Sequence, residues 1–223
     1  LYYLECALDE AQAFRATASL GSIFSSNSTS FRVPRVEVRI GEKKFDNSNY
    51  VFSGVFMGTR FDPEQFPLDN NPGAMRQVFW LAIDRAYKTA LEAIGRKKAA
   101  LRNVTQAEEL PDFSDAAPVK LVMPVPAFSV DQDAWKGRIS RLSKVFAAYP
   151  EVYTSSIDFE SSIDTYYFAN NEGTELRYTE LLAYVRLRAN GQAEDGMRLR
   201  DHAMFFAAEP SRLPSEADME REI

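Results

Sequence analysis

The sequence contains one cysteine and one histidine, and this scarcity limits the chemistry that the chain can carry by itself. Cys6 has no second cysteine with which to form an internal disulfide. A zinc site usually needs three or four ligands, which His202 and Cys6 together do not supply. We therefore assign no catalytic, metal-binding or cofactor-binding residue in this chain.

Basic residues are fewer than acidic ones, and long apolar runs are missing. The 26 Lys and Arg residues face 32 Asp and Glu residues, so the net charge is −6 and a general electrostatic basis for nucleic-acid binding is missing. No apolar run approaches the roughly 18 residues of a membrane span, and the first residues have the pattern of neither the n-region nor the h-region of a signal peptide. The one basic cluster is at the end of a predicted helix, where cations favour the helix dipole: Arg96, Lys97, Lys98 and Arg102.

What the chain does have is enough apolar material for a core, since 45% of its 223 residues are hydrophobic and 13% are aromatic. Apolar residues alternate with polar ones over 2–9, 14–20 and 31–40, which predicts three strands with a hairpin loop over Ser25–Ser30. The apolar parity changes at Pro34, which predicts an edge strand or a bulge there. Leu1 already lies in a strand pattern, so we expect an excised piece of a longer protein.

Two helices are predicted between the strand regions. Asn71 and Pro72 are a favourable N-cap and first-turn pair, and the apolar spacing predicts a helix over Pro72–Leu101. Ser129 and Gln132 have capping-box spacing, which predicts a second helix over Val130–Tyr149. The irregular stretch 41–73 predicts a long loop that is functional or packed, and the proline-rich stretch 103–130 predicts a linker containing a short apolar run, 119–123.

Three more strands follow, arranged around a turn at Asn170–Gly173. Ile157, Phe159 and Ile163 share one parity with Tyr153, as expected of a half-buried strand, and similar alternation recurs over 181–189 and 197–205. We predict an α+β protein whose antiparallel sheets are two three-stranded meanders, with two long helices packed on the sheet. The domain spans 1–223 and divides into two possible subdomains, 1–102 and 128–210, joined by the linker.

Two sets of residues could carry chemistry. Asp158 and Glu160 face the same side of a strand and could form a general-acid pair or an oxygen-ligand metal site. Because no third ligand is spaced to join them, a solvated strand face is favoured. His202 and Asp201 could join a serine in a triad, but the sequence has no G-x-S-x-G elbow, which favours a structural or surface histidine.

Cys6 and the aromatic run Tyr166–Phe168 have both structural and functional interpretations. Cys6 shares its strand parity with Leu4 and Leu8 and so lies on an apolar face. There a cysteine is typically a small buried hydrophobe rather than a nucleophile. The aromatic run could stack bases or line a peptide groove. Adjacent strand residues point to opposite faces, however, so one side of the run is core.

Three stretches together resemble one protein family. Asn170-Asn171-Glu172-Gly173-Thr174 resembles the N-S-E-G-T turn of the TldD/PmbA family, with Asn171 in place of the usual serine. The stretch 36–50 resembles the V-R-V-G-x-x-x-x-D-N-x-N-[FY] sequence of one bacterial branch, and Asp195-Gly196-Met197 fits the loop before the last strand. Members of this family have long been labelled modulators of DNA gyrase and are now regarded as metallopeptidases.

The resemblance implies an N-terminal α+β region without its catalytic half. Family members hold zinc in a C-terminal domain through an H-E-x-x-x-x-H-type motif and a later cysteine, and nothing in this sequence matches that motif. The implied role is the non-catalytic N-terminal region of a zinc metallopeptidase acting on flexible peptides, which helps to shape the peptide cavity and a homodimer. The zinc would lie in the missing domain.

The alternative is a stand-alone peptide- or protein-binding scaffold module without enzymatic activity. The acidic balance argues against direct DNA contact, which weakens a gyrase-related role. The lone cysteine is compatible with a cytoplasmic or an exported protein, so the compartment stays open.

Overall fold

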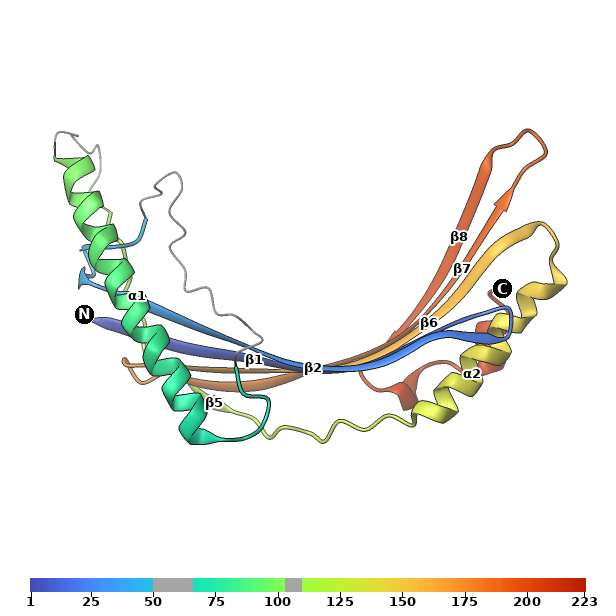
Figure 1. Cartoon of the computed structure of the whole chain (residues 1–223), viewed down its shortest axis with the longest axis horizontal. Helices are drawn as coiled ribbons and strands as arrows, with labels where there is room; N and C mark the ends of the chain where they lie inside the picture. The colour runs from blue at the N-terminus through green and yellow to red at the C-terminus, as the bar shows by residue number, and fades with distance from the viewer. Residues whose placement is uncertain (50–65, 103–109) are drawn as a thin grey trace. The chain divides into compact units, whose positions relative to one another are not determined.

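The computed structural model describes residues 1–49, 66–102 and 110–223 and shows an α+β protein (Figure 1). Most of its regular structure is strand, as the alternating patterns predict. Part of the irregular stretch 41–73 lies outside the described residues. The elements are β1 (Tyr3–Ser19), β2 (Ser22–Arg39), β3 (Gly41–Glu42), β4 (Phe45–Asp46), α1 (Pro72–Leu101), β5 (Lys120–Val122), α2 (Gln132–Val145), η2 (Phe146–Ala148), β6 (Val152–Asn170), β7 (Glu175–Gln192), β8 (Arg198–Ala207), η3 (Pro210–Arg212) and α3 (Glu216–Glu220).

The large sheet has six strands in the order β2-β1-β6-β7-β5, with β8 also paired to β7. The prediction of two three-stranded meanders is therefore wrong, because β1 pairs with β6 and joins the N-terminal and C-terminal strands in one sheet. The short apolar run of the predicted linker forms β5, which pairs parallel to β7, whereas β8 pairs antiparallel. β3 and β4 form a separate two-stranded sheet.

β1 and β2 are much longer than predicted, and the turn that joins them lies at a different position. The two predicted N-terminal strands are one strand, and the predicted hairpin loop Ser25–Ser30 is part of β2. The turn lies at Leu20 and Gly21, where both residues have positive φ, the conformation that a tight two-residue hairpin requires. Its tip is held by α2, since the Gly21 amide donates to Ser143 Oγ at 2.9 Å and Ser140 Oγ donates to the Gly21 carbonyl at 2.6 Å.

Pro34 lies on an edge strand, as predicted, because β2 is the first strand of the sheet. The predicted change of parity at Pro34 is wrong: Arg32, Pro34, Val36 and Val38 are all buried. Arg32 is only 5% exposed because its guanidinium pairs with Glu10 at 2.9 Å and donates to main-chain carbonyls. A charged residue thus occupies a buried position that the apolar pattern could not reveal.

The chain forms two compact units, each assembled from three stretches of sequence. Unit 1 contains 1–10, 31–124 and 165–178, and unit 2 contains 11–30, 125–164 and 179–223. This division differs from the predicted subdomains 1–102 and 128–210, which stay a prediction. Among the described helices, none has the length and apolar character needed to cross a membrane.

In unit 1, α1 packs small residues against β1 and β2. Its predicted bounds are confirmed, and the Asn71 side chain caps it by accepting from the Gly73 and Ala74 amides at 3.1 Å. The buried face is mostly alanine, which allows a close approach of the helix to the sheet. The cluster consists of Ala82, Ala86 and Ala90 with Val36, Val38 and partly buried neighbours including Leu4 and Cys6.

The predicted basic cluster at the end of α1 is only partly a surface feature. Lys97 is 3% exposed, and its ammonium donates to the Asp112 carboxylate and the Ser48 carbonyl while lying 4.7 Å from the centre of the Phe45 ring. Arg96, by contrast, is exposed and pairs with Glu92 one turn away at 3.7 Å. Lys97 therefore links α1 to the two segments that contain Ser48 and Asp112.

In unit 2, α2 covers the apolar side of β1, β6 and β7. Trp135 stacks on Phe159 with ring centres 4.0 Å apart, and Ile139 and Leu142 are fully buried beside them. The predicted parity of β6 is confirmed for Ile157, Phe159 and Ile163, whereas Tyr153 is exposed. The core also contains Phe14, Ala16, Ala18, Phe146, Ala183, Val185, Leu187, Leu213 and Met219.

The predicted start of α2 is wrong by two residues. Asp131 is the N-cap, and its Oδ1 accepts from the Ala134 amide at 3.0 Å, so Ser129 lies outside the helix. The helix is also shorter than predicted, because the α-helical turn changes to a 3-10 turn at Phe146. Aspartate is as good an N-cap as serine, which explains why the spacing of Ser129 and Gln132 misled.

Candidate functional site

The polar side of the unit 2 sheet holds the two carboxylates that the sequence singled out. Asp158 and Glu160 alternate with buried Ile157 and Phe159 on β6, so both side chains point away from the core. We call this side the polar face. It is defined by Arg15 and Thr17 of β1, Asp158 and Glu160 of β6, and Tyr184, Arg186 and Arg188 of β7, which contact one another.

Asp158 is surrounded by donors. Its Oδ1 accepts a hydrogen bond from Thr17 Oγ1 at 2.9 Å. Its Oδ2 forms ion pairs with Arg186 at 3.1 Å and with Arg188 at 2.9 Å. The carboxylate side chain is 14% exposed, whereas the arginines are 33% and 46% exposed. The aspartate therefore holds two guanidinium groups in place with part of each still open to solvent.

Glu160 binds two other residues of the polar face, Arg15 and Tyr184. Its Oε1 accepts from Arg15 at 2.9 Å, and its Oε2 accepts from the Tyr184 hydroxyl at 2.6 Å. Burial and the hydrogen bond to Glu160 raise the pKa of Tyr184, and the same carboxylate raises the pKa of Arg15. Since both carboxylates are occupied by neighbouring donors, this geometry favours an ion-paired strand surface over a general-acid pair.

β8 extends the polar face, because residues directly opposite in an antiparallel pair share one side of the sheet. The register pairs Tyr184 with Phe206, Arg186 with Met204 and Arg188 with His202. The Tyr184 and Phe206 rings are 6.1 Å apart, as this register requires. The sequence did not indicate that these residues would meet, because the polar face of β8 depends on its register with β7.

His202 does not form a triad with Asp201. Adjacent strand residues point to opposite faces, and Oδ1 of Asp201 accepts from the backbone amide of His202 rather than from its ring. Both residues are exposed. Among the described residues, no group of three or more His, Cys, Asp and Glu side chains could hold a metal ion.

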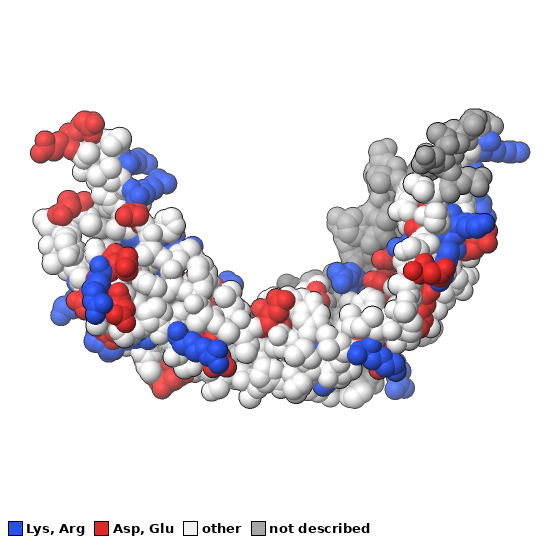
Figure 2. Space-filling model, turned by 180° about the vertical axis from the view of Figure 1, so that it is seen from behind, with Lys and Arg blue, Asp and Glu red and all other residues white. Residues whose placement is uncertain are grey.

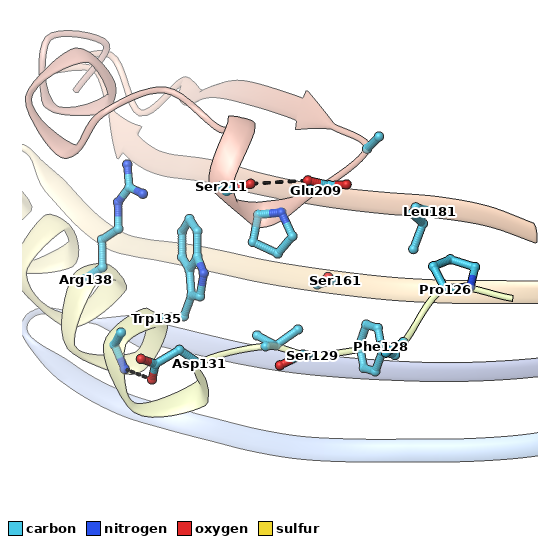
Figure 3. A pocket seen from close by; sticks show the side chains of 15 residues that line it. Pro126, Phe128, Ser129, Asp131, Trp135, Arg138, Ser161, Leu181, Glu209 and Ser211 are labelled. Carbon is cyan, nitrogen blue, oxygen red and sulfur yellow. Dashed lines mark hydrogen bonds between the residues drawn. The ribbon is translucent and has the colours of Figure 1, made fainter.

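A pocket with a volume of about 520 Å³ lies on the other side of the unit 2 sheet (Figure 3). Its walls are mainly apolar, and its lining includes Pro126, Phe128, Trp135, Leu181 and Pro210. Arg138 reaches it from α2, with its guanidinium 4.6 Å from the centre of the Trp135 ring. Burial lowers the pKa of Arg138, and this side chain donates to the Pro214 carbonyl, tying α2 to the C-terminal segment.

The remaining sequence candidates lie in unit 1 and are occupied by structural contacts. Cys6 is half-buried beside the α1 cluster, and burial raises the pKa of its thiol, which disfavours the thiolate. Tyr166 stacks on Tyr178 with ring centres 4.9 Å apart, and the Tyr167 hydroxyl faces Glu10 at 3.4 Å. These contacts do not leave a continuous aromatic platform for bases.

The turn between β6 and β7 has the geometry that its sequence predicts. Gly173 has a φ of +98°, and Asn170 Oδ1 accepts from the Glu172 and Thr174 amides. Asn171 does more than occupy the turn, because its side chain accepts from the Leu4 amide at 2.9 Å and donates to the Tyr2 carbonyl at 3.0 Å. The residue that departs from the family pattern thus links the turn to β1.

Comparison with known proteins supplies the class of fold. The sequence matches no family model and no curated protein. Among solved structures, the fold is that of the TldD/TldE proteins and the candidate modulators of DNA gyrase, which confirms the family resemblance at the level of the fold. At identities of 9–12%, these similarities show the fold alone.

Three solved structures illustrate the likeness. TldE from Thermococcus kodakarensis has a TM-score of 0.55 at 12% identity, over 100% of this chain and 43% of its own. A candidate modulator of a DNA gyrase from Thermotoga maritima has a TM-score of 0.57 at 9% identity, over 98% of this chain and 42% of its own. One from Bacteroides thetaiotaomicron has a TM-score of 0.55 at 9% identity, over 99% and 45%. This chain therefore spans less than half the length of these proteins.

Proposed function

We propose that this chain is the non-catalytic N-terminal region of a longer TldD/PmbA-like zinc metallopeptidase that acts on flexible peptides. The observation that carries the proposal is the extent of the structural match, which covers 98–100% of this chain but only 42–45% of the matched proteins. The composition is in keeping with it, because one histidine and one cysteine are too few for a zinc site. The zinc ligands would belong to the rest of the longer protein.

The polar face of unit 2 supports a role in shaping a peptide cavity. It combines partly exposed arginines with exposed apolar side chains: Leu182, Met204 and Phe206 are 41%, 38% and 60% exposed. Peptide-binding surfaces need such a mixture, because apolar contacts provide affinity and oriented charges provide specificity. In this proposal, unit 2 forms one wall of the cavity and supplies no reacting group.

The outer face of α1 supports a role in a homodimer. Trp80, Leu81, Tyr87 and Leu91 are 64%, 40%, 39% and 45% exposed, and Trp80, Tyr87 and Leu91 recur at helical spacing. The opposite face packs Ala82, Ala86 and Ala90 on the sheet. An exposed apolar stripe on a helix is a frequent mark of a protein interface.

The test of the catalytic proposal begins with the coding sequence beyond Ile223. We expect it to encode an H-E-x-x-x-x-H-type motif, and we expect the longer protein to hold zinc and to cleave an unstructured peptide in a chelator-sensitive manner. The 223-residue chain alone should not cleave that peptide. A stop codon shortly after Ile223 would contradict the proposal and favour the stand-alone binding module.

The dimer is tested separately on the longer protein by light scattering after size-exclusion chromatography. Trp80→Ser should shift the molar mass toward the monomer, because it removes the largest exposed apolar side chain of the stripe. Tyr153→Ser is the matched control, since Tyr153 is a 54% exposed aromatic residue on β6 in the other unit. Dimers of unchanged mass for both variants would exclude the α1 stripe as the interface.

A further inference from the structure

The β7–β8 end of the polar face carries an excess of arginine that the fold does not require. Asn190 is paired with Arg200 and Gln192 with Arg198, so these arginines continue the row begun by Arg186 and Arg188. Arg198 and Arg200 are exposed, and neither side chain makes a hydrogen bond or ion pair with another described residue. We call the following set the arginine ladder: Arg186, Arg188, Arg198, Arg200 and His202.

The charge on this ladder is not balanced locally. Asp158 is the carboxylate that pairs with it in the described part of the chain, and Asp158 already binds both Arg186 and Arg188. Glu194 and Asp195 lie in the turn beyond the ladder, where Asp195 accepts from the Met197 amide. In Figure 2, blue basic side chains lie next to the red acidic side chains at the tip of this hairpin. A chain of net charge −6 thus carries a local cationic surface.

We infer that the arginine ladder binds the carboxylates of an extended peptide that carries acidic side chains, followed by apolar ones, on the same face. Residues two apart on a strand are roughly 6.6 Å apart on one face, and alternate side chains of an extended peptide have the same spacing. Partly exposed guanidinium groups can form bidentate bonds with such carboxylates. The inference rests on the proposed peptide-binding role, and it names the class of peptide.

The apolar half of the same face favours a peptide over a nucleic acid. Beyond the ladder, the strands present Met204, Phe206 and Leu182, all exposed. On one face of an extended peptide, which carries every second residue, acidic side chains would lie on the arginines, and apolar side chains further along the same face would lie on these residues. A nucleic acid would leave Met204 and Leu182 without an apolar partner, whereas apolar side chains of the peptide would cover them.

The experiment measures binding to the purified 223-residue chain by fluorescence anisotropy. The probe is a labelled peptide in which every second residue is first glutamate and then, further along the same face, leucine, with threonine at the positions between. A version with glutamine in place of glutamate and an oligothymidylate of the same charge serve as comparisons. We expect the acidic peptide to bind about tenfold more tightly than the glutamine version, and to weaken as salt is raised.

A double variant tests the location. Arg198→Gln with Arg200→Gln removes two positive charges from exposed side chains that bind no other described side chain. The fold should therefore be kept, and circular dichroism would verify this. We expect about a tenfold loss of affinity for the acidic peptide. The matched control is Arg212→Gln with Arg221→Gln, which removes the same charge from exposed positions in unit 2 near the C-terminus. This control should bind nearly as the unaltered chain does.

Three results would overturn the inference: no binding of the acidic peptide, equal losses in the two double variants, or tighter binding of the oligothymidylate. Zinc content and peptide cleavage by the longer protein are separate readouts. If cleavage is zinc-dependent but the ladder variant binds and cleaves peptides normally, the peptide site lies elsewhere and the proposed function stands. If the ladder binds but no zinc motif exists, the chain is a binding module.

Discussion

Gly41 and Gly173 both have positive φ, but their surroundings differ. A Cβ on Gly41 would lie 2.4 Å from the Phe45 carbonyl oxygen and 3.0 Å from Ile94 Cδ1. A Cβ on Gly173 would meet only Pro118, at 3.7 Å. Gly41 is therefore required by a close backbone approach as well as by its conformation, whereas Gly173 is required by conformation alone.

We predict that Gly41→Ala and Gly173→Ala differ in the free energy of unfolding. Gly173→Ala should lower it by about 1 kcal/mol, the cost of a left-handed conformation for a residue with a Cβ. Gly41→Ala should lower it by roughly 2–4 kcal/mol, because the β3–β4 hairpin must also shift. Urea unfolding measures both. Equal losses would show that the contact with Phe45 relaxes freely.

Lys97 and Lys98 are neighbours on α1 with opposite environments, and they allow a second prediction at this scale. Lys97→Met should lower the free energy of unfolding by about 3 kcal/mol, because it leaves the largely buried Asp112 carboxylate without its cation. Lys98→Met should change it by less than about 0.5 kcal/mol, since Lys98 is exposed. Urea unfolding measures both free energies. Equal values for the two variants would contradict the structural role of the Lys97–Asp112 ion pair.

At the scale of elements, the start of α2 separates two candidate caps. Asp131→Ala should lower the free energy of unfolding by about 1 kcal/mol, because the Ala134 amide loses its acceptor and the helix dipole loses a favourable charge. Ser129→Ala should have little effect, since Ser129 lies outside the helix. A larger loss for Ser129→Ala, measured by urea unfolding, would place the cap at the residue that the capping-box spacing suggested.

The elements also show which local signals are reliable. Asn71 and Pro72 predicted the start of α1 because an N-cap acts on amides within the next turn. The hairpin between β1 and β2 was missed because Leu20 is an unfavourable residue for positive φ. Ser25–Ser30 looked like a loop by composition, yet these residues are in β2. Composition is a weaker guide than pairing with a neighbouring strand.

For the whole molecule, we predict that the chain retains no stoichiometric zinc. Its only histidine is exposed on β8, and its only cysteine has a pKa raised by burial, which weakens a thiolate ligand. Elemental analysis after dialysis should find far less than one zinc per chain. One tightly held zinc would contradict the assignment of no metal ligand in this chain. It would also contradict the proposal that the zinc ligands belong to the rest of the longer protein.

The sequence by itself determined the α+β class, the bounds of α1, the turn at Asn170–Gly173 and the buried parity of β6 and β7. These features depend on residues within a few positions of one another, through caps, turn conformations and alternation. The two carboxylates of the polar face were also predicted correctly to share one side of a strand, because the strand period is local.

Only the tertiary structure decided that the N-terminal and C-terminal long strands share one six-stranded sheet, that β5 lies parallel to β7, and that Lys97 and Arg32 are buried. It also decided which residues form the arginine ladder, because that depends on the register of β7 with β8. Strand partners are chosen by side-chain contacts between distant segments, and a register shift of one residue exchanges the two faces. Alternation along one strand assigns residues to two sides, but only pairing between strands decides which residues meet.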